Sequence, residues 1–169
     1  MIMVSKSTKL TTDELLELTK YPHIAALATV TPQGEPRVTP CWYEYDGETF
    51  NCSSVTNQAK IRYMRENPKV SLIVVYTSIR SQPLIVDGTA ELINEGINKS
   101  SEFRKRMILR YLGGDLGNLE KAKEYQDLLD SLGMTQIRIW PDKIRYHESG
   151  GLGIKPFNVL ANIDRLVGY

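Results

Sequence analysis

The chain has 169 residues, of which 41% are hydrophobic and 24% charged, and its formal net charge is +1. These values are ordinary for a globular protein, and they exclude a strongly basic chain that would bind nucleic acid or membranes through bulk charge. The N-terminus lacks the apolar core of a signal peptide, and no apolar run reaches the roughly 18 residues that span a bilayer. We therefore expect one cytoplasmic domain over residues 1–169. Cys41 and Cys52 have neither metal-site spacing nor the pattern of a disulfide framework.

Local patterns predict a helix and then three strands in the first third of the chain. The segment TTDELLELTK, residues 11–20, starts with a threonine cap and acidic residues, which favour a helix. HIAALATV, residues 23–30, is an apolar run typical of a strand buried on both faces. RVTPCWYEY at 37–45 and ETFNCSSV at 48–55 predict two more strands, and the Asp46-Gly47 pair predicts a hairpin between them.

Pro40 lies inside the second predicted strand. Because proline cannot donate a hydrogen bond to a sheet, it favours an edge strand or a break in the strand. A break at residues 39–42 would leave backbone groups free for a ligand. Both interpretations remain open from the sequence.

The stretch NCSSVTNQAKIRYMRENPKVSL, residues 51–72, predicts a strand end, a turn, a helix and a new strand. Asn57 is the predicted helix cap, which places Lys60 in the first turn. A cation there opposes the helix dipole by roughly 0.3–1 kcal/mol. The cost disappears if an anion sits between Lys60, the free amides and the hydroxyls of Ser53 and Ser54. The two interpretations are a phosphate cradle and a solvated lysine on a surface helix.

The second half of the chain predicts three strands and a pair of helices. KVSLIVVY at 69–76 and LIVDGTAELI at 84–93 predict strands, and Gly88 suggests a bulge in the second of them. Helical periodicity follows at 98–112 and 118–132, and MTQIRIWPDKIRYHES at 134–149 predicts a last strand interrupted at Pro141. Six strands, with a helix between the third and fourth and a helical pair before the sixth, favour an antiparallel barrel with flanking helices, because parallel pairing needs a crossover after each strand and the turn at 46–47 is too short for one.

Four segments together resemble the pyridoxamine 5'-phosphate oxidase-like family of flavin-binding split barrels. They cover most of residues 20–148 and read HIAALATVTPQGEPRVTPCWYEYDGETFNCSS, AKIRYMRENPKVSLIV, DGTAEL and IRIWPDKIRYH. The resemblance implies an α+β fold, a six-stranded antiparallel split β-barrel with Greek-key-like order and flanking helices. It also implies a homodimer that holds FMN at each subunit interface, and we expect residues 149–169 to form a tail on the body or on the second subunit.

The resemblance also implies roles for individual residues. The strand formed by Arg37, Val38, Thr39, Pro40, Cys41 and Trp42 would line the flavin. Ser53, Ser54 and Lys60, with Arg62 as a further cation, would hold the phosphate. Gln82 and Trp140 would reach the cofactor of the neighbouring subunit, and Arg145 and His147 match an Arg-x-His pair that binds substrate in the true oxidases. The alternative for Trp140 is a packed aromatic at the barrel end, and for Arg62 a solvated helix face.

The sequence departs from the true oxidases at several positions. Gln58 and Ala59 stand where those enzymes have Ser-Arg, Trp42 stands at or near a substrate-binding lysine, and Ser149 replaces their final flavin-binding arginine. With the long insert at 94–133, these departures resemble the general flavin or deazaflavin reductase branch.

The sequence has no Ser/His/Asp arrangement, metal cluster or acid pair, which fits an enzyme whose cofactor carries the hydride chemistry. Three functions therefore remain open. The first is an oxidoreductase that uses FMN on a small conjugated substrate, and the second is a reductase that uses the deazaflavin coenzyme F-420. The third is a non-catalytic flavin- or haem-binding sensor or storage protein.

Overall fold

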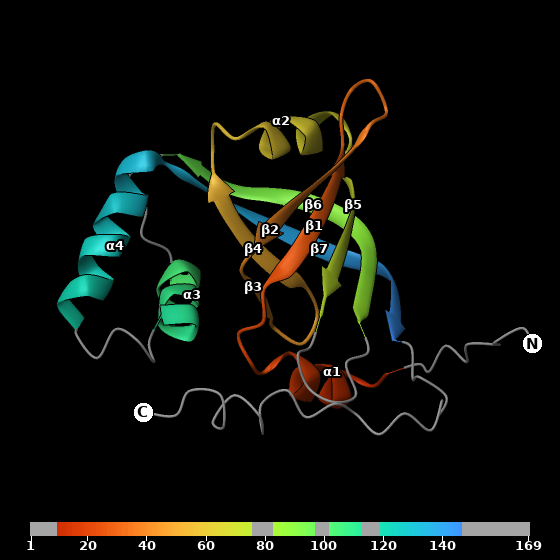
Figure 1. The fold of residues 1–169 in the computed structure, drawn as a ribbon, viewed down its shortest axis with the longest axis horizontal. Helices are drawn as coiled ribbons and strands as arrows, with labels where there is room; N and C mark the ends of the chain where they lie inside the picture. The colour runs from red at the N-terminus through yellow and green to blue at the C-terminus, as the bar shows by residue number, and fades with distance from the viewer. Residues whose placement is uncertain (1–9, 76–82, 97–101, 113–118, 147–169) are drawn as a thin grey trace, which may run out of the picture.

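The protein is described here from a computed structural model, which covers residues 10–75, 83–96, 102–112 and 119–146 (Figure 1). Seven strands form one antiparallel sheet in the order β2-β1-β5-β6-β7-β4-β3, and the sheet curls into a half-barrel. The strands are β1 (Ala25–Val30), β2 (Pro36–Cys41), β3 (Tyr43–Tyr45), β4 (Phe50–Val55), β5 (Lys69–Val74), β6 (Leu84–Gly96) and β7 (Met134–Tyr146). The helices are α1 (Thr12–Thr19), α2 (Ala59–Glu66), α3 (Glu102–Leu112) and α4 (Leu119–Leu132).

The predicted fold class, an α+β antiparallel split barrel with flanking helices, is confirmed, with seven strands instead of six. The extra strand arises at Trp42, which lies in neither β2 nor β3 and divides the strand predicted at 37–45. β2 pairs with β1 at one edge of the sheet, whereas β3 pairs with β4 at the other edge. The chain therefore passes from one edge to the other at Trp42. Pro40 lies in β2, an edge strand of the sheet. No partner strand lies on the open side of an edge strand, so a residue without an N–H loses no sheet hydrogen bond there.

The core fills the concave side of the curled sheet. Its largest buried side chains include Leu27 of β1, Tyr43 of β3, Phe50 of β4, Leu72 of β5 and Ile137 of β7. Each such side chain contributes roughly 1.5–3 kcal/mol by leaving water. In β1 burial alternates along the strand, so the prediction that this strand is buried on both faces is wrong. The alternate positions are alanines and a valine that stay half-buried, and the apolar run hid this alternation.

Two ends of the barrel are closed by short helices (Figure 1). Helix α2 lies across one end and buries Ile61 and Met64. Helix α1 lies at the other end, and its predicted threonine cap is confirmed as Thr11, which accepts from the Glu14 amide at 3.3 Å while the Glu14 carboxylate accepts from the Thr11 amide at 2.8 Å. This capping box satisfies two amides that would otherwise have no partner in the helix.

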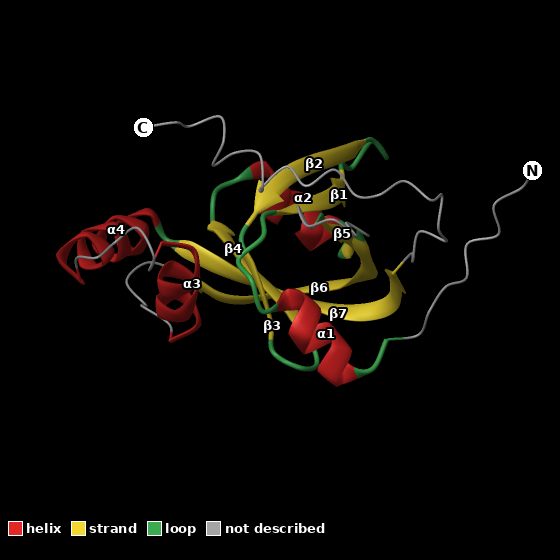
Figure 2. Ribbon diagram, turned by 60° about the horizontal axis from the view of Figure 1, so that its bottom comes forward, coloured by secondary structure: helices red, strands yellow, loops and turns green. Residues whose placement is uncertain are grey.

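Helices α3 and α4 form a hairpin beside the barrel (Figures 1 and 2). An ion pair between Arg104 and Asp130 joins the two helices, and the Arg104 side chain is buried. Arg110 of α3 donates to the carbonyl oxygens of Lys20 and Tyr21, at 3.0 and 2.7 Å, just after α1 ends. A cation beside free helix carbonyls is favourable, so Arg110 anchors the hairpin to the barrel.

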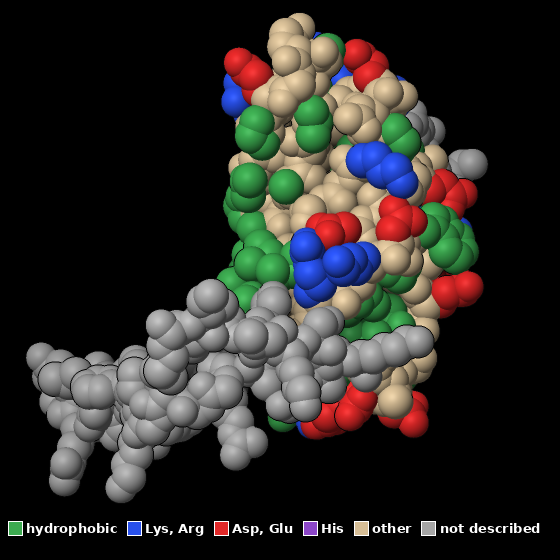
Figure 3. Space-filling model, turned by 90° about the vertical axis from the view of Figure 1, so that its right-hand side faces the viewer, with side chains coloured by type: hydrophobic (Ala, Val, Ile, Leu, Met, Phe, Trp, Pro, Cys, Tyr) green, Lys and Arg blue, Asp and Glu red, His purple; other side chains and the backbone are tan. Residues whose placement is uncertain are grey.

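The surface carries charges of both signs. On the face in Figure 3, lysine and arginine side chains lie among aspartate and glutamate side chains. Some of these opposite charges form exposed ion pairs, such as that between the Lys69 ammonium group and the Asp142 carboxylate at 3.0 Å. Among the described helices, none is both long enough and apolar enough to cross a bilayer.

Candidate functional site

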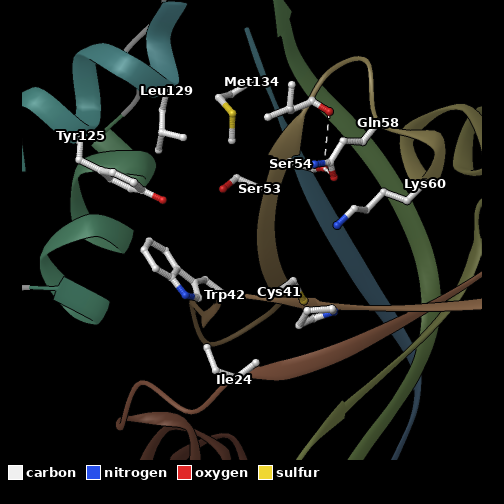
Figure 4. Close-up of a pocket in the computed structure, with 12 residues that line it drawn as sticks. Ile24, Cys41, Trp42, Ser53, Ser54, Gln58, Lys60, Tyr125, Leu129 and Met134 are labelled. Carbon is white, nitrogen blue, oxygen red and sulfur yellow. Dashed lines mark hydrogen bonds between the residues drawn. The ribbon is translucent and has the colours of Figure 1, made fainter. Parts of the chain in front are cut away.

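A cavity of about 310 Å³ lies where the barrel meets α2 and the α3–α4 hairpin (Figure 4). Its volume is at the lower end of the range for small-ligand pockets, about 300–1,000 Å³. The lining combines hydroxyls, one ammonium group, one thiol, aromatic rings and aliphatic side chains. It consists of Ile24, Pro40, Cys41, Trp42, Ser53, Ser54, Val55, Gln58, Lys60, Tyr125, Leu129 and Met134.

The fold brings these residues together at strand ends. β2 ends at Cys41, and the break at Trp42 turns the indole toward the cavity (Figure 4). β4 ends at Val55, so Ser53 and Ser54 arrive at the same place, and α2 starts four residues later. The β3–β4 hairpin predicted from Asp46-Gly47 is confirmed, and it sets the register that delivers Ser53 and Ser54.

The start of α2 differs from the prediction. The N-cap is Gln58, with extended backbone angles of −69° and 147°, so the prediction that Asn57 caps the helix is wrong. The Gln58 side chain makes no capping bond, because its Oε1 accepts a hydrogen bond from the Ser54 hydroxyl at 2.8 Å. In the described part of the chain, neither the Ala59 nor the Lys60 amide has a backbone acceptor. These amides therefore keep their capacity to bind an anion.

Lys60 supplies the positive charge of the cavity. Its ammonium group extends from α2 into the space beside Ser54 and Cys41 (Figure 4). Within the described ranges, no hydrogen bond or ion pair joins this ammonium group to another residue. A lysine in a first helical turn, without a carboxylate partner and beside two amides, is favourable once an anion binds between them.

An aromatic wall faces this polar side. The Trp42 ring stacks on the Tyr111 ring of α3, with 4.8 Å between the ring centroids and an interplanar angle of 4°. The centroid of the Tyr125 ring of α4 lies 6.1 Å from that of Trp42. The Tyr111 hydroxyl accepts from the Tyr43 amide at 3.0 Å and donates to the His23 carbonyl at 2.7 Å. Burial raises the pKa of Tyr111, so the hydroxyl stays protonated and able to donate. The Trp42 indole therefore packs against a ring that is itself hydrogen-bonded to β3 and to His23, in the segment that precedes β1.

The thiol of Cys41 contacts that of Cys52 at the base of the cavity, with a Sγ–Sγ distance of 3.8 Å. The hydrogen bond between the two thiols and the charge of Lys60 lower the pKa of Cys41, against the opposing effect of burial. Its hydrogen bond to Cys41 and complete burial raise the pKa of Cys52. Cys41 is therefore the member of the pair that ionises first.

Not every predicted site residue reaches the cavity. Six of those residues line it: Pro40, Cys41, Trp42, Ser53, Ser54 and Lys60. Gln82 and His147 lie outside the described residues. The others that the resemblance implied lie elsewhere on the chain: Arg37, Val38, Thr39, Arg62, Trp140 and Arg145.

These six have other surroundings. Arg37 pairs with Glu35, Val38 is 63% exposed on the edge strand, and the buried Thr39 hydroxyl has no hydrogen-bond partner among the described residues. Arg62 is exposed on α2, Trp140 is 41% exposed and donates to Glu91, and Arg145 pairs with Asp87. Because Trp140 was expected to serve a neighbouring subunit, its role stays a prediction that one chain does not test.

Six residues of the cavity lie outside the set predicted from the sequence. Val55 and Gln58 lie next to predicted positions or within two residues of them, and Ile24 directly precedes β1, whereas Tyr125, Leu129 and Met134 come from α4 and the start of β7. One available signal was the spacing of Tyr125 and Leu129, four residues apart and therefore on one face of their helix. The sequence contained no sign that this face turns toward the barrel.

Comparisons with known proteins identify the family and the fold of this chain. Residues 11–140 match the family model for pyridoxamine 5'-phosphate oxidase. A solved F420 reductase structure is 25% identical and superposes with a TM-score of 0.61, over 76% of this chain and 94% of that one. A search of curated protein sequences found no match.

Two further structures share the fold. A conserved hypothetical protein from Mycobacterium tuberculosis is 20% identical, with a TM-score of 0.68 over 94% of this chain and 97% of that one. The heme storage protein HutZ from Vibrio cholerae is 21% identical, with a TM-score of 0.56 over 80% of this chain and 93% of that one. The family match spans well over half of the sequence, and the curled antiparallel sheet is shared, so this chain belongs to the pyridoxamine 5'-phosphate oxidase family.

Proposed function

We propose that this protein is a flavin-dependent oxidoreductase that binds FMN in the cavity and acts on a small conjugated substrate. The observation that carries the proposal is the Lys60 ammonium group, which lines a cavity without a carboxylate partner in the described chain. A phosphate is the group that such a cation, beside free helix amides, recognises. The aromatic wall opposite supplies the flat apolar surface that a fused ring needs.

The donor set fits this cofactor. Lys60, the Ser53 hydroxyl and the amides of Ala59 and Lys60 would bind the phosphate, and Trp42 and Tyr125 would flank the ring. When bound, FMN supplies the hydride chemistry. The protein binds and orients the cofactor and shields it from water. Leu129 and Met134 exclude water from the cavity, and Tyr111 keeps the plane of the Trp42 ring in place. The backbone groups that the sequence predicted to be free for a ligand at residues 39–42 would face the pyrimidine edge of the flavin.

The deazaflavin coenzyme F-420 is the second candidate. The likeness to an F420 reductase at 25% identity favours it, as do the departures from the true oxidases at Trp42, Gln58 and Ala59. Its longer acidic tail would need cations beyond Lys60, and the exposed Arg62 on the same helix is one available group. Both cofactors contain a phosphate and a fused ring, so either of them would make the same contacts with Lys60 and Trp42.

The test is redox cycling of the bound cofactor. We expect FMN added to the apoprotein to bind, to lose its visible absorption with dithionite or a nicotinamide donor, and to recover it with an acceptor. F-420 added in parallel identifies the second candidate by its own absorption band. Tight flavin binding with no spectral change from any donor or acceptor would contradict the oxidoreductase and favour a sensor or storage role. A Soret band after haem addition, without flavin binding, would do the same.

We also propose that the protein is a homodimer with cofactor at the interface. Trp140 and Arg145 lie away from the cavity of their own chain, and Val38 and Trp140 are exposed apolar side chains on the barrel. A second copy would cover them and bring them toward its own cavity, through an interface of roughly 1,200–2,000 Å² or more. Sedimentation at micromolar concentration should show a species of twice 19.2 kDa. A single species at the monomer mass would contradict the proposal.

A further inference from the structure

The chain has two cysteines, and the fold places them in contact. Both are free and buried, and their sulfur atoms are 3.8 Å apart. A disulfide bond is about 2.05 Å long, so the sulfurs need to approach by less than the width of one atom. Ten residues separate Cys41 and Cys52, and these include the whole of β3 and its hairpin.

The two cysteines face each other across the seam of the barrel. Cys41 ends β2, one edge strand of the sheet, and Cys52 lies in β4, next to the other edge. No ladder of hydrogen bonds joins β2 to β4 in the described sheet, although the two strands contact each other. The residue after Cys41 is Trp42, which lies outside both strands. The backbone beside Cys41 is therefore free of ladder bonds on the side where a bond to Cys52 would form.

The surroundings make the two thiols unequal. Cys41 lines the cavity with Lys60 and is 8% exposed, whereas Cys52 is fully buried. Because the thiolate is the reactive form, the cation beside Cys41 favours attack by this sulfur. Cys52 lies behind it, out of reach of a small oxidant but within reach of an oxidised Cys41. This arrangement of an accessible thiol and an adjacent resolving thiol is that of reversible thiol-oxidation sites.

We propose that Cys41 and Cys52 form a reversible oxidation site, in which hydrogen peroxide that enters the cavity converts the pair to an intramolecular disulfide across the barrel seam. The Cys41 thiolate attacks one peroxide oxygen and the O–O bond breaks, giving a sulfenic acid and a hydroxide that takes up the thiol proton to become water. The Cys52 sulfur then attacks the Cys41 sulfur, and the S–O bond breaks with release of a second water. Two thiols are oxidised and one hydrogen peroxide is reduced, and a small dithiol reverses the change. This inference does not depend on the identity of the cofactor.

The test follows the thiols by mass. The full chain is reduced, freed of reductant, treated with one equivalent of hydrogen peroxide and then alkylated with N-ethylmaleimide. We expect the wild-type protein to lose two hydrogen atoms and to take up no maleimide, and dithiothreitol should restore both reactive thiols. A peptide map should link Cys41 to Cys52 within one chain, and this measurement needs no variant.

A matched pair of variants assigns the two roles. In Cys52→Ser the sulfenic acid has no resolving partner, so dimedone should label Cys41, whereas it should not label the wild type. In Cys41→Ser the remaining thiol, that of Cys52, is buried. Its oxidation by hydrogen peroxide should be slower by about tenfold or more than the oxidation of Cys41 in Cys52→Ser. The proposal is overturned if the wild type keeps both thiols, if only disulfides between chains form, or if Cys41→Ser reacts as fast as Cys52→Ser.

Discussion

Replacing Lys60 with alanine should weaken FMN binding by about 10- to 150-fold. The reason is the loss of one charge-assisted hydrogen bond to the phosphate, worth roughly 1.5–3 kcal/mol, where each 1.4 kcal/mol is a tenfold change in affinity. Riboflavin lacks the phosphate, so it should bind the wild type and Lys60→Ala almost equally. The measurement is a titration of both ligands into both proteins, followed by flavin fluorescence.

The stability of the apoprotein gives an independent readout of the same change. Lys60 lies in the first turn of α2, where its charge opposes the helix dipole by roughly 0.3–1 kcal/mol. Lys60→Ala should therefore leave the apoprotein as stable as the wild type or slightly more stable. A fall in FMN affinity without a fall in stability separates a lost ligand contact from a damaged fold.

Lys105→Ala is the matched control for charge. Lys105 is exposed on α3 and pairs with Glu102 at 2.7 Å, and it does not line the cavity. Its removal takes away the same positive charge and should leave the affinities for FMN and riboflavin unchanged within about twofold, since exposed pairs contribute little. If Lys60→Ala changes both ligands equally, or neither, the lysine is an ordinary solvated side chain and the phosphate site must lie elsewhere.

The parts of the fold that could be predicted from the sequence depend mainly on interactions between residues that are close together in the chain. Thr11 and Glu14 form their capping box three residues apart, the turn that contains Asp46 and Gly47 joins β3 to β4 within the four residues 46–49, and the bulge predicted at Gly88 is present between Asp87 and Gly88. The capping box and the turn depend on neighbours within a few positions, so the sequence pattern contains the whole interaction, whereas the bulge also depends on the pairing of β6 with β7.

Partners far apart in the sequence decided the rest. RVTPCWYEY is a continuous β-like run, and nothing within it shows that β2 pairs with β1 while β3 pairs with β4. Asn57 is intrinsically the better cap, yet the helix starts after Gln58, whose side chain is held by Ser54. Tertiary contacts outweighed propensity in both places.

The candidate site divides in the same way. Ser53, Ser54 and Lys60 belong to one continuous stretch, so their convergence could be predicted from a strand end followed by a helix. Tyr125 and Leu129 reach the cavity from the α3–α4 hairpin, whose placement depends on Arg110 and on Tyr111 bonding to other elements. The contact between Cys41 and Cys52 depends on closure of the barrel, which no local pattern encodes.

Gly88→Ala should destabilise the protein by about 3 kcal/mol, at or above the upper end of the usual cost of overpacking. Gly88 lies at the bulge where β6 meets β7, and an added Cβ would overlap the Trp140 carbonyl oxygen and lie 2.9 Å from the Ile139 Cγ2. The main obstacle is backbone in the sheet, so no side chain can rotate away to relieve it. β7 also pairs with β4, the strand that presents Ser53 and Ser54.

Urea unfolding of the apoprotein, followed by tryptophan fluorescence, measures this cost as a lower midpoint at unchanged slope. For a chain of this length the same loss corresponds to a fall in Tm of roughly 6–12 °C. Gly34→Ala is the control, because an added Cβ there meets nothing within 4 Å although φ is +83°. It should cost only the backbone strain of about 1–2 kcal/mol. Equal losses in the two variants would show that β7 moves away from Gly88 at little cost, and that the bulge does not require glycine.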